Sequence, residues 1–236
     1  MKRLDQIKSI VTNADSHRHR RGSYSQAGED LIVKFIFDTI GVRNPSYIDI
    51  GAHHPFYLNN TAILYETGSR GINVEPDPGL FTEFEKHRKN DQNLNCGVGA
   101  SDGSMDLYVM SVPTMNTFSR EEAERLVREN GFSIVRQVPV TMMSVPTIIS
   151  KYCNGVFPDF LNLDIESLDD VVIGSIDFKG SIPAVICLET ISYSESGRGQ
   201  KNNDIIRKME QHGYMVYADT FINTIFVLKS KWLRNS

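Results

Sequence analysis

Short apolar runs alternate with amphipathic stretches along most of the chain. Val, Ile, Leu and Phe fill these runs nearly without interruption, which is typical of parallel strands buried on both faces of a sheet. The predicted strands span residues 47–52, 71–76, 93–100, 160–164 and 183–188, with a final pair at 214–218 and 222–228. A short turn joins that pair, so the two strands are predicted to be antiparallel.

Helical spacing of apolar residues predicts helices between these strands. Ser25 and the acids at 29 and 30 favour a helix that ends at Gly41, before Pro45. Residues 104–143 interrupt the alternation. There we predict a strand at 105–110, a helix at 120–130 and a strand at 135–141, which together form a substrate-facing insert on an antiparallel ribbon.

The chain of 236 residues has the length of one domain. We interpret residues 1–22 as a short helix and linker, and residues 23–236 as the domain. A net charge of −4 does not favour a nucleic-acid partner, and no apolar stretch reaches the ~20 residues of a membrane span. Three widely spaced cysteines without a CxxC pair favour reduced thiols and a cytoplasmic location.

The stretch from Tyr47 to Pro76 combines a strand, a glycine turn at Gly51, a helix and a second strand that ends at Glu75. This order is typical of the first half of a nucleotide-binding α/β unit, in which the final acid accepts the ribose hydroxyls. A salt bridge or helix cap is the alternative role for Glu75. No G-x-G-x-x-G follows Asp49, which speaks against an NAD-dependent oxidoreductase.

Six motifs occur in an order and spacing that together resemble one family: Tyr24–Asp30, Tyr47–Ala52, Asn73–Pro76, Gly97–Gly103, Asn162–Glu166 and Cys187–Glu189. The chain resembles FkbM-type S-adenosylmethionine-dependent methyltransferases over roughly residues 24–229. The resemblance implies a Rossmann-like class I α/β fold, with a seven-stranded sheet, helices on both faces and an antiparallel last strand. It also implies methyl transfer to an oxygen atom, often on a sugar or polyketide.

The resemblance also implies roles for residues around the cofactor, S-adenosylmethionine. Glu75 would clamp the ribose, and Asp102 would accept the adenine amine unless it only stabilises an Asp-Gly turn. Asp49 would receive the cofactor ammonium next to Gly51, while Gln26 would close over the methionine end.

Two catalytic hypotheses follow for the acidic residues at the ends of the later strands. In the first, His54 or Glu166 is the general base that takes the hydroxyl proton. In the second, Asp164 and Glu189 bind a divalent Mg or Mn ion that lowers the pKa of the hydroxyl. The alternative without a catalytic role is that Asp164 and Glu166 cap the next helix and orient the acceptor.

We therefore expect a cytoplasmic O-methyltransferase that acts on a sugar hydroxyl of a nucleotide-linked or polysaccharide precursor. A polyketide or other small-molecule hydroxyl is an alternative acceptor. A non-catalytic module that binds an adenosyl ligand is a second alternative, and a homodimer is left open.

Overall fold

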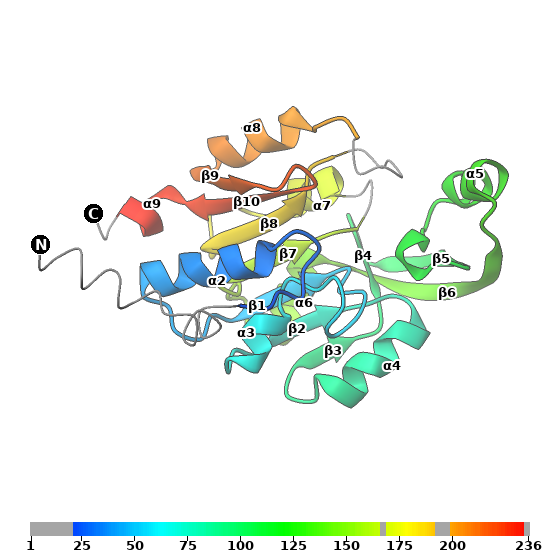
Figure 1. The fold of residues 1–236 in the computed structure, drawn as a ribbon, viewed down its shortest axis with the longest axis horizontal. Coiled ribbons are helices and arrows are strands. Elements are labelled where there is room, and N and C mark those ends of the chain that lie inside the picture. Colours follow the sequence, from blue (N-terminus) through cyan, green and yellow to red (C-terminus); the bar gives the residue numbers. More distant parts are fainter. Residues whose placement is uncertain (1–20, 166–168, 192–198, 234–236) are drawn as a thin grey trace, which may run out of the picture.

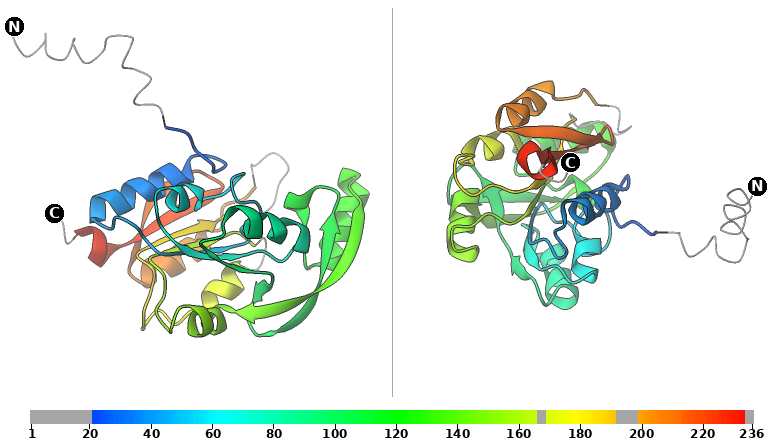
Figure 2. Two further views of the ribbon diagram at one scale, coloured as in Figure 1. Left: turned by 90° about the horizontal axis from the view of Figure 1, so that it is seen from below. Right: turned by 90° about the vertical axis from the view of Figure 1, so that its left-hand side faces the viewer.

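The computed structural model describes residues 21–165, 169–191 and 199–233. The predicted helix at residues 3–13 and the candidate base Glu166 lie outside these ranges. Figures 1 and 2 show a central sheet flanked by helices, with a separate strand-and-helix arm beyond one end of the sheet.

The central sheet has seven strands in the order β3-β2-β1-β7-β8-β10-β9. Every neighbouring pair is parallel except those that β10 makes with β8 and β9. Its strands are β1 (Tyr47–Ile50), β2 (Gly71–Val74), β3 (Gln92–Leu94), β7 (Phe160–Leu163), β8 (Val185–Glu189), β9 (Tyr214–Asp219) and β10 (Asn223–Leu228). The predicted fold class, with its antiparallel last strand, is confirmed.

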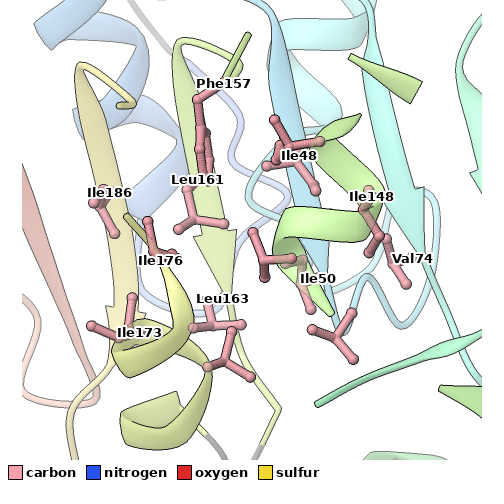
Figure 3. Packing of buried hydrophobic residues seen from close by; sticks show 14 of the residues in the cluster. Ile48, Ile50, Val74, Ile148, Phe157, Leu161, Leu163, Ile173, Ile176 and Ile186 are labelled. Atoms are coloured by element: carbon pink, nitrogen blue, oxygen red, sulfur yellow. The ribbon is translucent and has the colours of Figure 1, made fainter. Parts of the chain in front are cut away.

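Two apolar clusters bury the two faces of this sheet. Ile48 and Ile50 of β1 pack with α6 (Val145–Tyr152), α7 (Asp169–Ser175) and α8 (Asn203–Gln211), and Figure 3 shows the centre of this cluster. Tyr47 faces the opposite way, toward the helices of the second cluster, which are α2 (Glu29–Ile40), α3 (Ala62–Glu66) and α9 (Lys229–Trp232). Alternate residues of a strand thus cover both layers.

Local signals set the helix ends where the sequence predicts them. Gly41 ends α2 in the left-handed conformation, and its N–H donates to the Phe37 carbonyl. Asp77 caps α4 (Pro78–His87) by accepting from the N–H of Gly79, as expected for an aspartate ahead of a proline at the first helical position.

The predicted third strand at 93–100 is wrong as a single element, because it is divided between two sheets. β3 extends the central sheet, whereas β4 (Gly97–Gly99) pairs with β6 (Ile134–Ser144), which in turn pairs with β5 (Gly103–Met110). The break lies at Asn95, whose side-chain amide donates to the carbonyls of Glu75 and Pro76. These contacts hold the chain at the end of β2 while it leaves the sheet.

The predicted insert is an antiparallel ribbon with a helix, as expected. It contains η2 (Pro113–Met115) and α5 (Arg120–Asn130) between β5 and β6. The helix packs on β5 through Ala123 and Leu126 against Met110. Figure 1 shows this arm projecting beyond the end of the sheet at which β1 and β2 finish.

The chain order of the central strands reverses between β1 and β7, which are parallel neighbours. Ligands in open α/β sheets bind at the carboxyl ends of the strands at such a switch point. Among the helices in the described ranges, none has the length and apolarity needed to cross a membrane.

Candidate active site

The turn after β1 is tightly packed against the neighbouring strand end. Gly51 has φ of 77°, and a Cβ there would lie 1.9 Å from the backbone oxygen of Asp164. Only glycine combines this conformation with so close an approach. His53 follows with φ of 56°, a conformation that is uncommon for a residue with a side chain.

Glu75 lies directly after β2 and is buried. Its two carboxylate oxygens accept from the backbone N–H groups of His53 and Asp77, each at 2.8 Å. Burial raises the pKa of Glu75 to about 8, against the lowering effect of these two donors. The carboxylate is thereby fixed at the edge of the cavity, with lone pairs left for a ligand.

Asp49 is fully buried under this turn and is surrounded by side-chain donors. Thr61 donates to it at 2.7 Å, Asn162 at 2.8 Å and Asn59 at 3.1 Å. Burial raises the pKa of Asp49 although all three donors lower it. The aspartate therefore ties β1 to β7 and to the loop that precedes α3.

Arg88 supports the same loop from behind and is itself fully buried. Its guanidinium pairs with Asp91 at 3.0 Å and donates to the carbonyl of Pro55 and to the hydroxyls of Tyr47 and Thr61. A buried ion pair persists only when its remaining donors are satisfied in this way. Arg88 thus holds the loop at 55–61 against β1.

Asp164 and Glu189 lie at the carboxyl ends of the adjacent strands β7 and β8, and their carboxyl groups share a hydrogen bond. Part of the Asp164 side chain is accessible from the cavity. Protein atoms surround the rest of it. That burial raises the pKa of Asp164, and the nearby acids Asp49 and Glu29 raise it further. Burial raises the pKa of Asp164 to about 6, so two carboxyl groups joined in this way can share a proton as the pH falls toward that value.

A cavity of about 890 Å³ opens over these strand ends. The cofactor-side wall includes Gln26, Gly51, His53 and Glu75, followed by Cys96 and Gly97. The wall at the later strands includes Asn60, Asn162, Asp164, Glu189 and Asn223. The insert closes the third side with the apolar side chains of Met105, Leu107, Met115, Phe118 and Phe132.

Two predicted site residues lie elsewhere. His54 is absent from the described lining of the cavity, because its Nδ1 accepts from the N–H of Phe56 and its ring packs edge-on to Tyr57. Asp102 is likewise absent from that lining. Its oxygens accept from the Ser144 N–H and the Thr147 hydroxyl at the start of α6, and these hydrogen bonds lower the pKa of Asp102.

The family assignment follows from a comparison with protein-family models. The model described as the methyltransferase FkbM domain matches residues 49–216, which includes the turn at Gly51, Glu75 and the Asp164–Glu189 pair. The chain belongs to the FkbM methyltransferase family. It is an S-adenosylmethionine-dependent methyltransferase, as its motifs predict.

Three solved methyltransferase structures are similar to the chain at low sequence identity. No curated protein matches the FkbM-family chain significantly. The TehB-like S-adenosylmethionine-dependent methyltransferase of Corynebacterium glutamicum shares 10% identity and a TM-score of 0.41, with 97% of each chain covered. The precorrin-6y C5,15-methyltransferase of Geobacter metallireducens shares 11% identity and a TM-score of 0.42, with 84% of this chain and 88% of that chain covered. The methyltransferase domain of bacterial CtHen1-C shares 10% identity and a TM-score of 0.42, with 86% of this chain and 99% of that chain covered.

The cofactor-side wall of this methyltransferase fits an adenosyl ligand. The absent Cβ of Gly51 leaves the turn flush with the cavity, and the Glu75 carboxylate is held in place at its edge. The two neighbouring ribose hydroxyls would donate two hydrogen bonds, which the remaining lone pairs of this buried carboxylate can still accept. Glu75 would therefore hold the ribose, with Gly51 against the methionine portion and Gln26 above it.

The described residues offer too few ligands for a divalent metal ion. Asp164 and Glu189 are adjacent, but within the described ranges no three or more His, Cys, Asp or Glu side chains are grouped as a metal site. Magnesium and manganese prefer about six oxygen ligands, and these two carboxyl groups already bond to each other. The described donor set does not fit a resident metal, and we derive no step through one.

Sequence reasoning missed a chain of amides beneath the site. The amide of Asn60 donates to Asn162 at 2.9 Å, and Asn162 donates to Asp49. The sequence did indicate a role for Asn162, because it is a polar residue inside an otherwise apolar strand. Such a residue needs a buried partner, and Asp49 on the neighbouring strand is its register partner.

Proposed function

We propose that this methyltransferase transfers the methyl group of S-adenosylmethionine to a hydroxyl of a sugar or sugar-like acceptor, with the Asp164–Glu189 pair as the base. The hydrogen-bonded carboxyl pair carries the proposal, because both groups line the cavity that the cofactor turn and the insert also line. Carboxylate and amide side chains line this part of the wall, and both types bind hydroxyl groups well.

The chemistry requires a group that takes the hydroxyl proton as the oxygen attacks. When bound, S-adenosylmethionine supplies a methyl group activated by a positively charged sulfur. The ionised member of the Asp164–Glu189 pair would accept the proton of the acceptor O–H, so that the oxygen could bond to the methyl carbon. The carbon–sulfur bond would break in the same step, with S-adenosylhomocysteine as the leaving group. The pair then holds the proton until solvent removes it.

This assignment replaces His54 as the proposed base. His53, rather than His54, lines the cavity, and burial lowers the pKa of both rings. His53 also donates its backbone N–H to Glu75, so the geometry favours a role for this residue in shaping the cofactor turn. Glu166, the other predicted base, belongs to the undescribed residues.

The test is a transfer assay with methyl-labelled S-adenosylmethionine and a panel of glycosides, oligosaccharides, sugar nucleotides and polyketide alcohols. Label that is recovered in an alkali-stable methyl ether supports O-methylation of a hydroxyl. Label recovered only on nitrogen, carbon or an ester contradicts it. Activity that is unchanged by EDTA is expected, whereas loss that Mg²⁺ or Mn²⁺ restores would favour the metal route through Asp164 and Glu189.

A further inference from the structure

The insert side of the cavity combines an apolar wall with three charged residues of α5. Glu121, Glu122 and Arg125 line the cavity beside Met115 and Phe118. This wall lines the same cavity as the Asp164–Glu189 pair, so it is available to the part of an acceptor that extends away from the reacting hydroxyl.

Arg125 is engaged by two acids of its own helix. Its guanidinium pairs with Glu122 at 2.5 Å and with Glu129 at 3.0 Å. The first pair is bidentate, since Nε also donates to the second oxygen of Glu122 at 2.9 Å. A guanidinium held in this geometry has its fork-shaped donor face occupied, and it is not presented to a phosphate.

The other charged side chains in the described lining of the cavity are acids. Its described lining includes one arginine or lysine, Arg125, together with the acids Asp49, Glu75, Glu121, Glu122, Asp164 and Glu189. Burial lowers the pKa of His53, so this ring is neutral at pH 7. Phosphate recognition in proteins depends on Arg, Lys or unpaired backbone N–H groups.

We propose that the acceptor is a molecule without phosphate in the part that enters the cavity, such as a glycoside or oligosaccharide hydroxyl, and not a nucleotide-linked sugar. The apolar wall then packs on the C–H face of the acceptor, and the acids receive its hydroxyls. This inference rests on the proposed function and narrows its substrate class.

The experiment uses uridine and UDP, which differ only in the diphosphate, as probes of the full chain saturated with S-adenosylhomocysteine. Binding of S-adenosylhomocysteine in the first step tests the proposed function by itself, and its failure would remove that function before any probe is added. In the second step, calorimetry is expected to show UDP binding no tighter than uridine. Tenfold or greater preference for UDP that disappears in Arg125→Gln would overturn the inference. A tenfold preference that survives Arg125→Gln would overturn it as well, because other groups of the chain would then bind the diphosphate.

Neutralising one partner of Arg125 tests whether the ion pairs of this guanidinium prevent it from binding phosphate. Glu122→Gln releases part of the guanidinium and is expected to strengthen UDP binding severalfold. Glu124→Gln is the matched control, because Glu124 pairs with the exposed Arg120 on the same helix. Equal UDP affinities in the two variants would contradict the assigned role of the Glu122–Arg125 pair. S-adenosylhomocysteine binding by each variant confirms that it is folded.

Discussion

The two ends of the cavity use carboxylates in opposite ways. At the cofactor end, Glu75 and Asp49 are buried and accept from N–H and O–H donors of the protein. At the acceptor end, Asp164 and Glu189 bond to each other and face the cavity. A carboxylate saturated by fixed donors is a structural or binding group, whereas a pair that shares one proton is suited to proton transfer.

Neutralising the acceptor-end pair should have the largest effect. Asp164→Asn removes a group that can accept the hydroxyl proton, and general-base catalysis contributes roughly 10²–10⁴-fold to a rate. We expect a loss of this size in kcat, measured with labelled S-adenosylmethionine, while S-adenosylhomocysteine still binds. Asp219→Asn is the control, since Asp219 pairs with Lys201 outside the described cavity lining. Near-normal turnover in Asp164→Asn would remove the proposed base.

Neutralising the cofactor-end acid should come next. At a pH above the raised pKa of Glu75, which is about 8, Glu75→Gln removes a charged hydrogen-bond acceptor worth about 1.5–3 kcal/mol. It also places an NH₂ group against one of the two backbone N–H donors. We expect S-adenosylhomocysteine to bind roughly 10- to 150-fold more weakly by calorimetry. Glu85→Gln, on the exposed side of α4, is the control. Equal affinity in both variants would argue against a ribose clamp.

The pH dependence of turnover should report the shared proton. The base works only when it is ionised, so activity falls as the pH drops through its pKa. Burial and the neighbouring acids raise the pKa of Asp164, which places the acid limb above the ordinary aspartate value of about 3.9. Glu189→Ala removes the hydrogen bond that lowers this pKa and should move the limb further upward. A limb near pH 4 in both proteins would contradict the pairing.

The smallest effect is expected where the insert is attached to the cofactor end. Asp77 pairs with Arg136 of β6 at 2.8 Å and accepts from Asn116 of the insert at 3.0 Å. Arg136 is half-exposed, so the pair contributes at most about 1 kcal/mol. Arg136→Gln should raise the acceptor KM up to roughly fivefold with little change in kcat. Arg120→Gln breaks an exposed pair within α5 only and should leave KM unchanged.

Much of the fold was predictable, because buried parallel strands and the glycine turn leave strong local patterns. Tyr47–Ile50 and Phe160–Leu163 are apolar apart from Asp49 and Asn162, and Gly51 marks the turn that follows the first of these strands. Glu75, which the strand-end pattern singled out, lines the cavity, and its role as a ribose clamp stays a prediction. The division of residues 93–100 was not predictable, because it depends on hydrogen bonds from Asn95 to a distant strand end.

The finer assignment of site residues depended on backbone geometry that a sequence does not display. His53 and His54 are adjacent, and the left-handed conformation of His53 decides which ring faces the cavity. Asp102 appears free in a turn, yet Ser144 and Thr147 at the start of α6 occupy its oxygens. The support of Asp49 by Asn60 and Asn162 likewise appears only when three segments come together.

The most direct test of this division of roles measures two quantities in the same two variants: the Kd of S-adenosylhomocysteine and the kcat of methyl transfer at saturating cofactor. Binding at the cofactor end and proton transfer at the acceptor end predict that Glu75→Gln loses affinity but recovers most of its turnover at saturation. They predict that Asp164→Asn keeps its affinity and loses turnover. If both variants lose both quantities in proportion, the two ends do not have separate roles.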